Sequence, residues 1–328
     1  MLITVFNLQI FATETTNTLT AEMKTFYDKA LILTAEPALV HMQFGQKRPL
    51  PKGEGKTVNF RRFSALPKAL TALTEGVTPE GNQLATSAVT ATVAQYGDYI
   101  KQSDLLEMTA VDNTILEATK LLGNQGGLTL DTVVRNEIAG GTNVLYAEGT
   151  SRSGLTANSK ITMAKVFEAA AVLKAANAPK IDGSYVAFIH PYVAHDLMTE
   201  AKEGGSWVDV NKYADAEKIY NGEIGKLAGI RFIETSEAKI WVGAGDNCPD
   251  GLAVFGTIIV GEGAYGVTEL EGGGMEVIVK QLGYGDDPLN QRSSVGWKAT
   301  MTAKRLAEEF MVRIESTSAF SASVTKAN

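Results

Sequence analysis

The sequence predicts an α+β fold, in which a polar hairpin and a long helix precede a mixed lobe and a set of returning strands. Apolar residues recur every three or four positions from Leu105 to Leu122 and again from Leu130 to Ile138. This spacing predicts one long helix, kinked at the glycines between the two stretches, or two helices in line. Thr57–Phe60 and Ala88–Val93 alternate polar and apolar residues, as strands with one buried face do.

The remaining elements follow from periodicity and turn residues. Asp104 has a cap-forming side chain and Glu107 follows three positions later, which is the capping-box spacing. Glu22–Leu33, Met163–Leu173 and Val210–Tyr220 predict helices, and Pro191 predicts the start of another. Strands are predicted at Tyr185–Ile189, Ile230–Ile233, Leu252–Val260, Ala264–Leu270, Met275–Leu282, Val295–Thr302 and Phe310–Ile314.

Composition excludes several classes of protein. The 328-residue chain is 45% hydrophobic and 20% charged, as folded globular proteins are, and its net charge of −7 disfavours a nonspecific nucleic-acid binder. Its one cysteine, Cys248, can form neither an internal disulfide nor a cysteine-based zinc site. We expect no secretory signal, because Met1–Ala12 lacks a basic start, and no helix that spans a membrane.

Residues that imitate catalytic or binding motifs do not satisfy them. Gly55-Lys56-Thr57 resembles the end of a phosphate-binding loop, but Leu50 replaces the required glycine and a strand follows. Gly261, Gly263 and Gly266 fit G-x-G-x-x-G without a following helix, which favours a hairpin turn. We therefore predict no enzyme, no cofactor and no metal.

Other chemistry-bearing residues favour structural roles. The pair His190 and His195 lacks the i, i+4 spacing of metal ligands on a helix, so both are interpreted as structural. Asp286 and Asp287 precede Pro288 and indicate a turn. The three tryptophans are dispersed and are interpreted as core or interface anchors: Trp207, Trp241 and Trp297.

Charge is distributed unevenly along the chain. Seven basic residues and one acid lie between Gly45 and Leu70, whereas eight acids and one base lie between Gly243 and Asn290. These segments are either two solvated faces or complementary surfaces of neighbouring copies, since opposite fields fix the register between subunits. The candidate inter-subunit residues are Lys47, Arg48, Lys52, Lys56, Arg61, Arg62, Glu262, Glu269, Glu271, Asp286 and Asp287.

The order of these elements resembles the capsid fold shared by tailed phages, encapsulins and the herpesvirus shell floor. Short segments from about Leu39 to Glu315 are, in addition, similar to the major capsid proteins of phages related to coliphage N-four. Each segment is weakly specific, but together they occur in order along nearly the whole chain: Gln43-Phe44-Gly45-Gln46, Gly55-Lys56-Thr57-Val58, Phe60-Arg61-Arg62, Leu73-Thr74-Glu75-Gly76, Thr78-Pro79, Gln95-Tyr96-Gly97, Ser103-Asp104, Thr129-Leu130-Asp131, Gly141-Thr142, Ser151-Arg152, Ile189-His190-Pro191, Trp207-Val208-Asp209, Lys212-Tyr213-Ala214, Gly222-Glu223-Ile224-Gly225, Asp287-Pro288-Leu289, Val295-Gly296-Trp297-Lys298 and Val312-Arg313-Ile314-Glu315.

The resemblance implies a tailed-phage major capsid fold with four parts. Residues 1–36 would be an N-terminal arm, 46–99 an extended β-hairpin loop, 100–155 and 271–328 a peripheral domain with a spine helix, and 156–270 an axial domain. It implies a structural subunit that assembles with itself into pentamers and hexamers. These would form an icosahedral head in the virion, which is assembled in the host cytoplasm and encloses double-stranded DNA without reading its sequence.

Further partners implied by the resemblance are portal and decoration proteins, and no membrane is involved. Either a separate scaffolding protein or no scaffold is implied, because the chain lacks a long charged N-terminal extension.

Since the hairpin's apolar face is too thin to form its own core, it must lie on the body of the chain or on a neighbour. Deleting Leu50–Val89 is therefore expected to leave a folded monomer that does not assemble.

Three alternatives remain at this stage. An encapsulin-type compartment shell would share the fold, and neighbouring genes for a terminase or a cargo enzyme would separate the two. A nucleotide-dependent enzyme would rest on Gly55-Lys56-Thr57 or on Gly261 to Gly266, and nucleotide binding would reveal it. A secreted adhesive β-rich module is disfavoured by the long helix.

Overall fold

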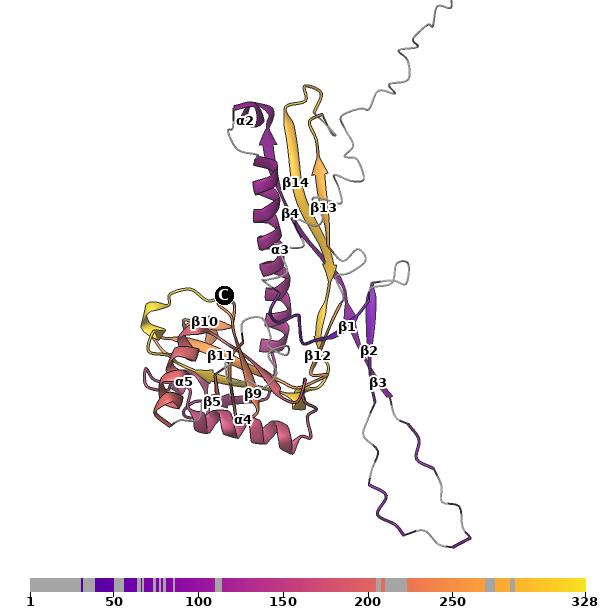
Figure 1. The fold of residues 1–328 in the computed structure, drawn as a ribbon, viewed down its shortest axis with the longest axis vertical. Helices are drawn as coiled ribbons and strands as arrows, with labels where there is room; N and C mark the ends of the chain where they lie inside the picture. Colours follow the sequence, from indigo (N-terminus) through magenta and orange to yellow (C-terminus); the bar gives the residue numbers. More distant parts are fainter. Residues whose placement is uncertain are drawn as a thin grey trace, which may run out of the picture. The chain divides into compact units, whose positions relative to one another are not determined.

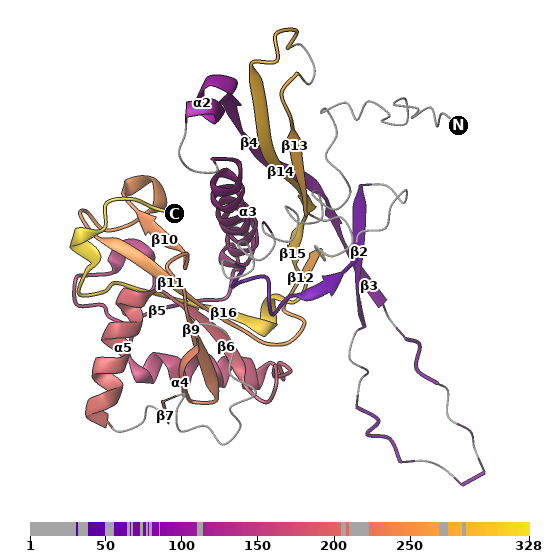
Figure 2. The same ribbon diagram turned by 45° about the horizontal axis from the view of Figure 1, so that its top comes forward.

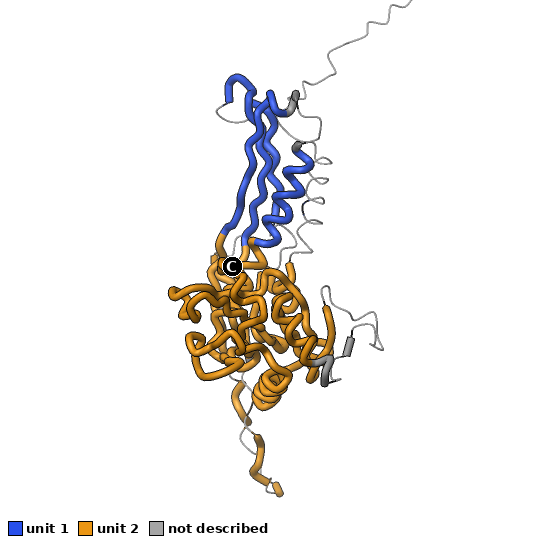
Figure 3. The backbone as a smooth tube through the Cα atoms, turned by 90° about the vertical axis from the view of Figure 1, so that its left-hand side faces the viewer, with its two compact units in different colours: residues 1–38, 95–128, 275–300 blue, residues 39–94, 129–274, 301–328 orange. Residues whose placement is uncertain are grey.

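A computed structural model of the chain describes residues 31, 39–49, 56–63, 66, 68–72, 75–76, 78, 81–84, 86–109, 114–204, 208–209, 223–268, 275–283 and 287–328. The predicted N-terminal arm and the helix at Glu22–Leu33 lie outside these residues except for Leu31, which is helical and fully buried. The helix predicted at Val210–Tyr220 also lies outside them. Two compact units are distinguished, comprising residues 1–38, 95–128 and 275–300, and residues 39–94, 129–274 and 301–328 (Figure 3).

The first unit contains a three-stranded sheet and most of a long helix. Its strands are ordered β13 (Met275–Lys280), β14 (Arg292–Met301) and β4 (Ala94–Ser103) (Figure 1). The two helices are α2 (Asp104–Thr109) and α3 (Thr114–Ala139), the latter continuing into the second unit. Helix α3 runs through Gly123–Gly127 without interruption. Glycine at position 126 lets the helix pack closely on the sheet, because a Cβ there would lie 2.7 Å from Met275 Cε and 3.2 Å from the Trp297 ring.

The second unit is built on a mixed sheet of eight described strands (Figure 2). Its order is β5 (Val144–Tyr146), β16 (Met311–Ser316), β11 (Ala253–Val260), β6 (Tyr185–Ile189), β9 (Ile230–Glu234), β8 (Glu223–Leu227) and β7 (Val208–Asp209), with β10 (Ile240–Val242) also pairing with β11. Every residue of β6 and β11 is buried, as expected for central strands covered on both faces.

Helices α4 (Met163–Ala175) and α5 (Pro191–Gly204) cover one face of this sheet. Their apolar residues, which include Val166, Leu173 and Leu197, share one core with Tyr185, Ala187 and Ile189 of β6. Strand alternation sends Phe188 to the opposite face, where its ring lies 4.5 Å from that of His41 and 5.8 Å from that of Phe44. The segment before β1 therefore covers the second face.

A smaller sheet and a hairpin complete the second unit. Strands β1 (Gln46–Arg48), β12 (Tyr265–Thr268) and β15 (Ala303–Arg305) form the sheet, and β2 (Thr57–Phe63) pairs with β3 (Thr86–Thr92) in antiparallel register. Val58, Phe60 and Ala91 are buried, with Val89 and Val93 packed beside them, which confirms the predicted apolar face.

Several sequence predictions are confirmed and two need correction. The strands β6, β9, β11, β13, β14 and β16 and helix α4 were predicted within a few residues, and the predicted start of α5 at Pro191 is confirmed. The cap of α2 is Ser103 instead of Asp104, because Ser103 Oγ accepts a hydrogen bond from Leu106 N at 3.3 Å. Leu105, predicted on a continuous buried face, is 67% exposed, since α2 has six residues and is too short to extend the face of α3.

The compact units divide the chain at other residues than the four predicted segments. Strand β16, which was grouped with 271–328, lies in the centre of the large sheet between β11 and β5. Its residues Val312 and Ile314 belong to the same core as α4 and α5, so burial places this strand in the second unit.

Candidate assembly surfaces and charged core

The base and the tip of the β2–β3 hairpin differ in burial. At the base, Phe60 is 1% exposed and packs directly on Gly266 of β12, where a Cβ would overlap its ring. All described residues from 66 to 84 are exposed, including Leu66 at 57%, Leu70 at 87% and Leu84 at 64%. The hairpin is therefore anchored on its own chain at one end and presents uncovered apolar side chains at the other.

Most of the described basic candidates are exposed near this hairpin. Lys47 and Lys56 are exposed, Arg61 is exposed on β2, and Arg48 on β1 is half-buried. Arg62 differs, because it forms an ion pair with Glu309 and its guanidinium lies 5.2 Å from the centre of the Phe310 ring. Arg62 thus has a partner within its own chain, whereas Lys52 lies outside the described residues.

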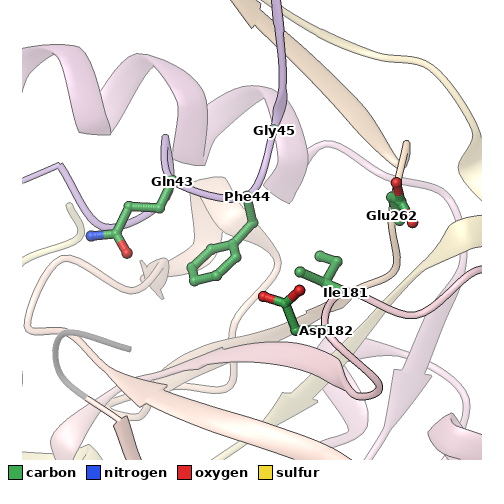
Figure 4. Close-up of a pocket in the computed structure, with 6 residues that line it drawn as sticks. All are labelled: Gln43, Phe44, Gly45, Ile181, Asp182 and Glu262. Carbon is green, nitrogen blue, oxygen red and sulfur yellow. The ribbon is translucent and has the colours of Figure 1, made fainter. Parts of the chain in front are cut away.

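The acidic candidates are not brought together into one described surface. Glu262 is exposed and lines a hollow of about 430 Å³ with Gln43, Phe44, Gly45, Ile181 and Asp182 (Figure 4). In Figure 4 the Asp182 carboxylate lies beside the Phe44 ring, while Glu262 comes from the turn after β11. Glu269, Glu271 and Asp286 lie outside the described residues.

Asp287 serves the turn that contains it. Its side chain is 7% exposed, and its carboxylate accepts a hydrogen bond from Arg292 N at 2.7 Å. Burial raises the pKa of Asp287, but hydrogen bonds from the backbone of Gln291, Arg292 and Gly283 outweigh it and hold the pKa below its usual value. The turn interpretation is therefore confirmed for Asp287.

A charged network that the sequence did not predict lies inside the large-sheet unit. Glu315 on β16 is fully buried and accepts two hydrogen bonds of 2.7 Å from Arg152 and one of 2.8 Å from Arg313. The Arg152 guanidinium lies 4.0 Å and that of Arg313 5.3 Å from the centre of the Trp241 ring. Gly256 permits this packing, because a Cβ there would lie 2.7 Å from the same ring. The network joins the loop after β5, β10 and β16.

A second buried polar contact fixes the segment before β1. His41 and Asp131 are both 0% exposed. The Asp131 carboxylate accepts two hydrogen bonds from His41, one from the backbone N at 2.7 Å and one from the ring Nδ1 at 2.6 Å. The Tyr265 hydroxyl donates to His41 O, and burial raises the pKa of Tyr265 well above its ordinary value. These contacts join helix α3, strand β12 and the segment at His41.

Of the other two histidines, His190 lies at a strand-to-helix corner, as predicted, whereas His195 lies within helix α5. His190 is 8% exposed, packs 4.9 Å from both the Tyr192 and Phe255 rings, and accepts a hydrogen bond from Tyr192 N at 3.2 Å. Burial lowers the pKa of His190 to about 4. His195 is 62% exposed.

The described residues of the motifs rejected from sequence lie at the start of a strand and in a turn. Thr57 begins strand β2, and Gly263 occupies a turn with φ of +72° between β11 and β12. Among these residues there is no group of three or more histidine, cysteine or carboxylate side chains that could hold a metal. Within the same part of the chain, every helix is too short or too polar to cross a membrane.

Comparison with known proteins identifies the family. Residues 104–282, more than half of the chain, match the family model described as phage capsid protein. The chain belongs to this family. The capsid protein is accordingly a subunit of a phage head shell and a component of the virion. No curated protein sequence matches it.

Solved structures share the fold of the capsid protein at low sequence identity. The capsid of Ralstonia phage GP4 matches with a TM-score of 0.66 and 15% identity over 84% of this chain and 87% of that one. The head of Helicobacter pylori bacteriophage KHP40 matches with a TM-score of 0.64 and 11% identity over 86% and 90%. The capsid of cyanophage Pam1 matches with a TM-score of 0.58 and 16% identity over 96% and 99%. The predicted tailed-phage capsid fold is confirmed.

Proposed function

We propose that the capsid protein assembles into pentamers and hexamers of an icosahedral head that encloses the double-stranded DNA of a tailed phage, and that it acts without catalysis. The observation that carries this proposal is the two-part character of the β2–β3 hairpin. Phe60 and Val58 hold its base on the chain, while Leu66, Leu70 and Leu84 are exposed. A chain acting alone gains nothing from these leucines, whereas a neighbouring copy can cover them.

Burial of the exposed leucines between subunits supplies a considerable free energy when it is summed over a shell. Full burial of one leucine side chain stabilises by roughly 1.5–3 kcal/mol, so three partly covered leucines supply a modest contact in each copy. Closed rings repeat that contact at every subunit boundary. Weak contacts of this kind allow wrongly placed subunits to dissociate before a shell closes.

Charge complementarity supports a defined register between copies. Lys47, Lys56 and Arg61 are exposed cations near the hairpin, whereas Asp182 and Glu262 line the hollow shown in Figure 4. These are the groups we propose to meet across a subunit boundary. Arg62 and Asp287 contribute less, because each already has partners within its own chain.

The division into parts is also a proposal. Residues 156–270 would lie nearest the centre of each ring as the axial domain, together with strand β16, which lies in their sheet, and the rest of 100–155 and 271–328 would form the peripheral domain. Scaffolding, portal and decoration proteins would be separate partners. The encapsulin alternative is not favoured, because the matching family model is that of a phage capsid protein.

Electron microscopy of the chain expressed alone, after size fractionation, tests the proposal. Closed shells or capsomer rings are expected, and their symmetry gives the ring sizes directly. If only monomers form, coexpression with the neighbouring genes is expected to produce shells. Monomers that persist under coexpression would contradict assembly through these surfaces.

A further inference from the structure

Strand β10 has an outer edge that, among the described residues, is bounded by side chains instead of a strand. Its only described strand partner is β11, and Gly256 N donates to Lys239 O at 2.9 Å on that inner side. In an antiparallel ladder the residues on either side of such a bonded position direct their backbone groups away from the partner strand. These outward residues are Ala238, Ile240 and Val242.

Asn328 occupies this outer edge with its side-chain amide. The Asn328 Oδ1 atom accepts a hydrogen bond from Ile240 N at 2.8 Å, and Asn328 Nδ2 donates to Ala238 O at 2.8 Å. An added strand would also accept from one backbone group of the edge and donate to another. Lys239 Nζ donates to Asn328 O beside this pair. One carboxamide therefore makes two of the bonds that a neighbouring strand would make.

A second side chain completes the closure. Val242 N donates to Asp246 Oδ2 at 3.4 Å, so both outward N–H groups of β10 are bonded to side-chain oxygens. Asp246 lies in the turn directly after β10 and closes the edge locally. Asn328, in contrast, is 88 positions from Ile240 and reaches the edge only through the fold of the segment before it.

That segment, residues 317–328, is called the strap and is held at several points along its length. Ala319 N donates to Asp196 Oδ2 at 2.9 Å, and Ser321, which is 1% exposed, donates from Oγ to Ala253 O at 2.8 Å. Val324 packs against the core that helices α4 and α5 share with the large sheet. In Figures 1 and 2 the yellow strap ends beside β10. These contacts deliver Asn328 to the edge.

We propose that the strap keeps the outer edge of β10 closed to β10 of a second copy of the chain. An uncovered strand edge pairs readily with another chain, and the residues Ile240, Trp241 and Val242 all favour strands. Two copies of β10 can pair antiparallel about a two-fold axis, since each edge then supplies the donors and acceptors that the other needs. The strap thus leaves the remaining surfaces of the capsid protein to govern how copies meet.

Amide hydrogen exchange of the full-length unassembled chain, resolved by NMR, tests the closure. In Asn328→Ala the amide of Ile240 should exchange at least about tenfold faster, because its acceptor is removed. The amide of Gly256, on the inner side of β10, should change by less than about twofold and reports that the sheet remains folded. Lys326→Ala, at an exposed position of the same strap, is the matched control and should alter neither amide. Unchanged exchange at Ile240 in Asn328→Ala, or an equal acceleration at Gly256, would overturn the proposal.

Sedimentation velocity tests the partner. The measurement uses chains in which Leu66, Leu70 and Leu84 are replaced by serine, so that the result does not depend on the assembly contacts proposed above. Adding Asn328→Ala should produce dimers whose proportion rises with concentration, whereas adding Lys326→Ala should not.

A third variant shows whether these dimers use the β10 edge. Val242→Pro removes an outward N–H without removing a bond to β11, so adding it to Asn328→Ala should abolish the dimers. Absence of dimers in Asn328→Ala, or dimers that persist with Val242→Pro, would overturn the proposal.

Discussion

At the scale of single residues, His190 shows how burial determines the chemistry of a motif residue. Its ring packs between Tyr192 and Phe255, and burial lowers its pKa from 6.5 to about 4. The neutral imidazole accepts a hydrogen bond from Tyr192 N, which a protonated ring nitrogen could not do. His190 is therefore a core residue that favours the neutral form.

The capsid protein should lose stability in acid through this residue. As pH falls, the His190 ring of the unfolded chain binds a proton near pH 6.5 and that of the folded chain only near pH 4. The contribution of His190 to the free energy of unfolding is therefore fully present above pH 6.5 and is lost as the pH falls to 4. The shift corresponds to at most about 3 kcal/mol. Urea unfolding at about pH 7.5 and 4.5 should show a smaller acid loss in His190→Asn than in the unmodified chain. His195→Asn is the control, being 62% exposed, and an equal acid loss in all three proteins would contradict the assignment.

Glu315 is the second residue with a predicted effect. It is fully buried and accepts hydrogen bonds from both Arg152 and Arg313, so Glu315→Gln leaves two partly buried guanidinium groups facing an amide. We expect a loss of about 3–5 kcal/mol in the free energy of unfolding. Glu309→Gln, which breaks the exposed pair with Arg62, should cost no more than about 1 kcal/mol. Urea denaturation measures the free energy of unfolding of both variants. Equal losses would show that the buried network stabilises the fold no more than the exposed pair does.

At the scale of elements, helix α3 shows why a glycine-rich segment can remain helical. Gly123, Gly126 and Gly127 are buried, although glycine is a weak helix former. At Gly126 the neighbouring Trp297 and Met275 occupy the space of a side chain, so tertiary packing outweighs propensity. From sequence alone the glycines indicated a kink or a break, because the partner strand is more than a hundred positions away in the chain.

A substitution at Gly126 tests that packing. Gly126→Val places a branched side chain where a Cβ alone would lie 2.7 Å from Met275 Cε, so we expect a destabilisation of about 1–3 kcal/mol. Asn124→Val, at an exposed position of the same helix, is the matched control and should change stability by about 0.5 kcal/mol or less. Thermal unfolding compares them. Because valine is a better helix former than glycine, propensity cannot explain a loss at Gly126, and equal stability in the two variants would contradict the tight packing.

At the scale of the whole molecule, the sequence predicts the elements that carry their own pattern. Strands β6 and β11 are continuous apolar runs, and β2 and β3 alternate, so each was found within a few residues. Strands β1, β5, β10 and β15 were missed, because three residues contain no period and such strands form only by pairing with distant ones. For example, β1 pairs with β12 through Gln46 and Gly266. Strands β4, β7 and β8 were missed as well, although β4 has ten residues.

The same contrast between local pattern and distant contacts applies to the site residues. Charge clustering along the chain identified Lys47, Lys56 and Arg61 as exposed cations, but could not show that Arg62 pairs with Glu309, 247 positions away. Likewise Arg152 and Glu315 stood in separate motif segments, and only the fold joins them. Contacts of long sequence separation depend on the completed fold, whereas local periodicity does not.

The hairpin tip provides the test that belongs to the assembled shell. Deleting Leu50–Val89 would also remove Phe60 and Val58, which are buried on the body, so substitutions at the tip are a sharper experiment. Replacing Leu66, Leu70 and Leu84 together by serine removes the exposed apolar surface without touching the base of the hairpin. We expect an unchanged unfolding midpoint, because these side chains are exposed in the single chain. Sedimentation and electron microscopy should show at least tenfold fewer closed shells, since a loss of about 1.4 kcal/mol in contact free energy suffices for a tenfold change. The matched control replaces the exposed polar residues Lys68, Thr71 and Asn82 of the same segment by serine and should assemble normally. Normal shells from the leucine variant would show that another surface drives assembly.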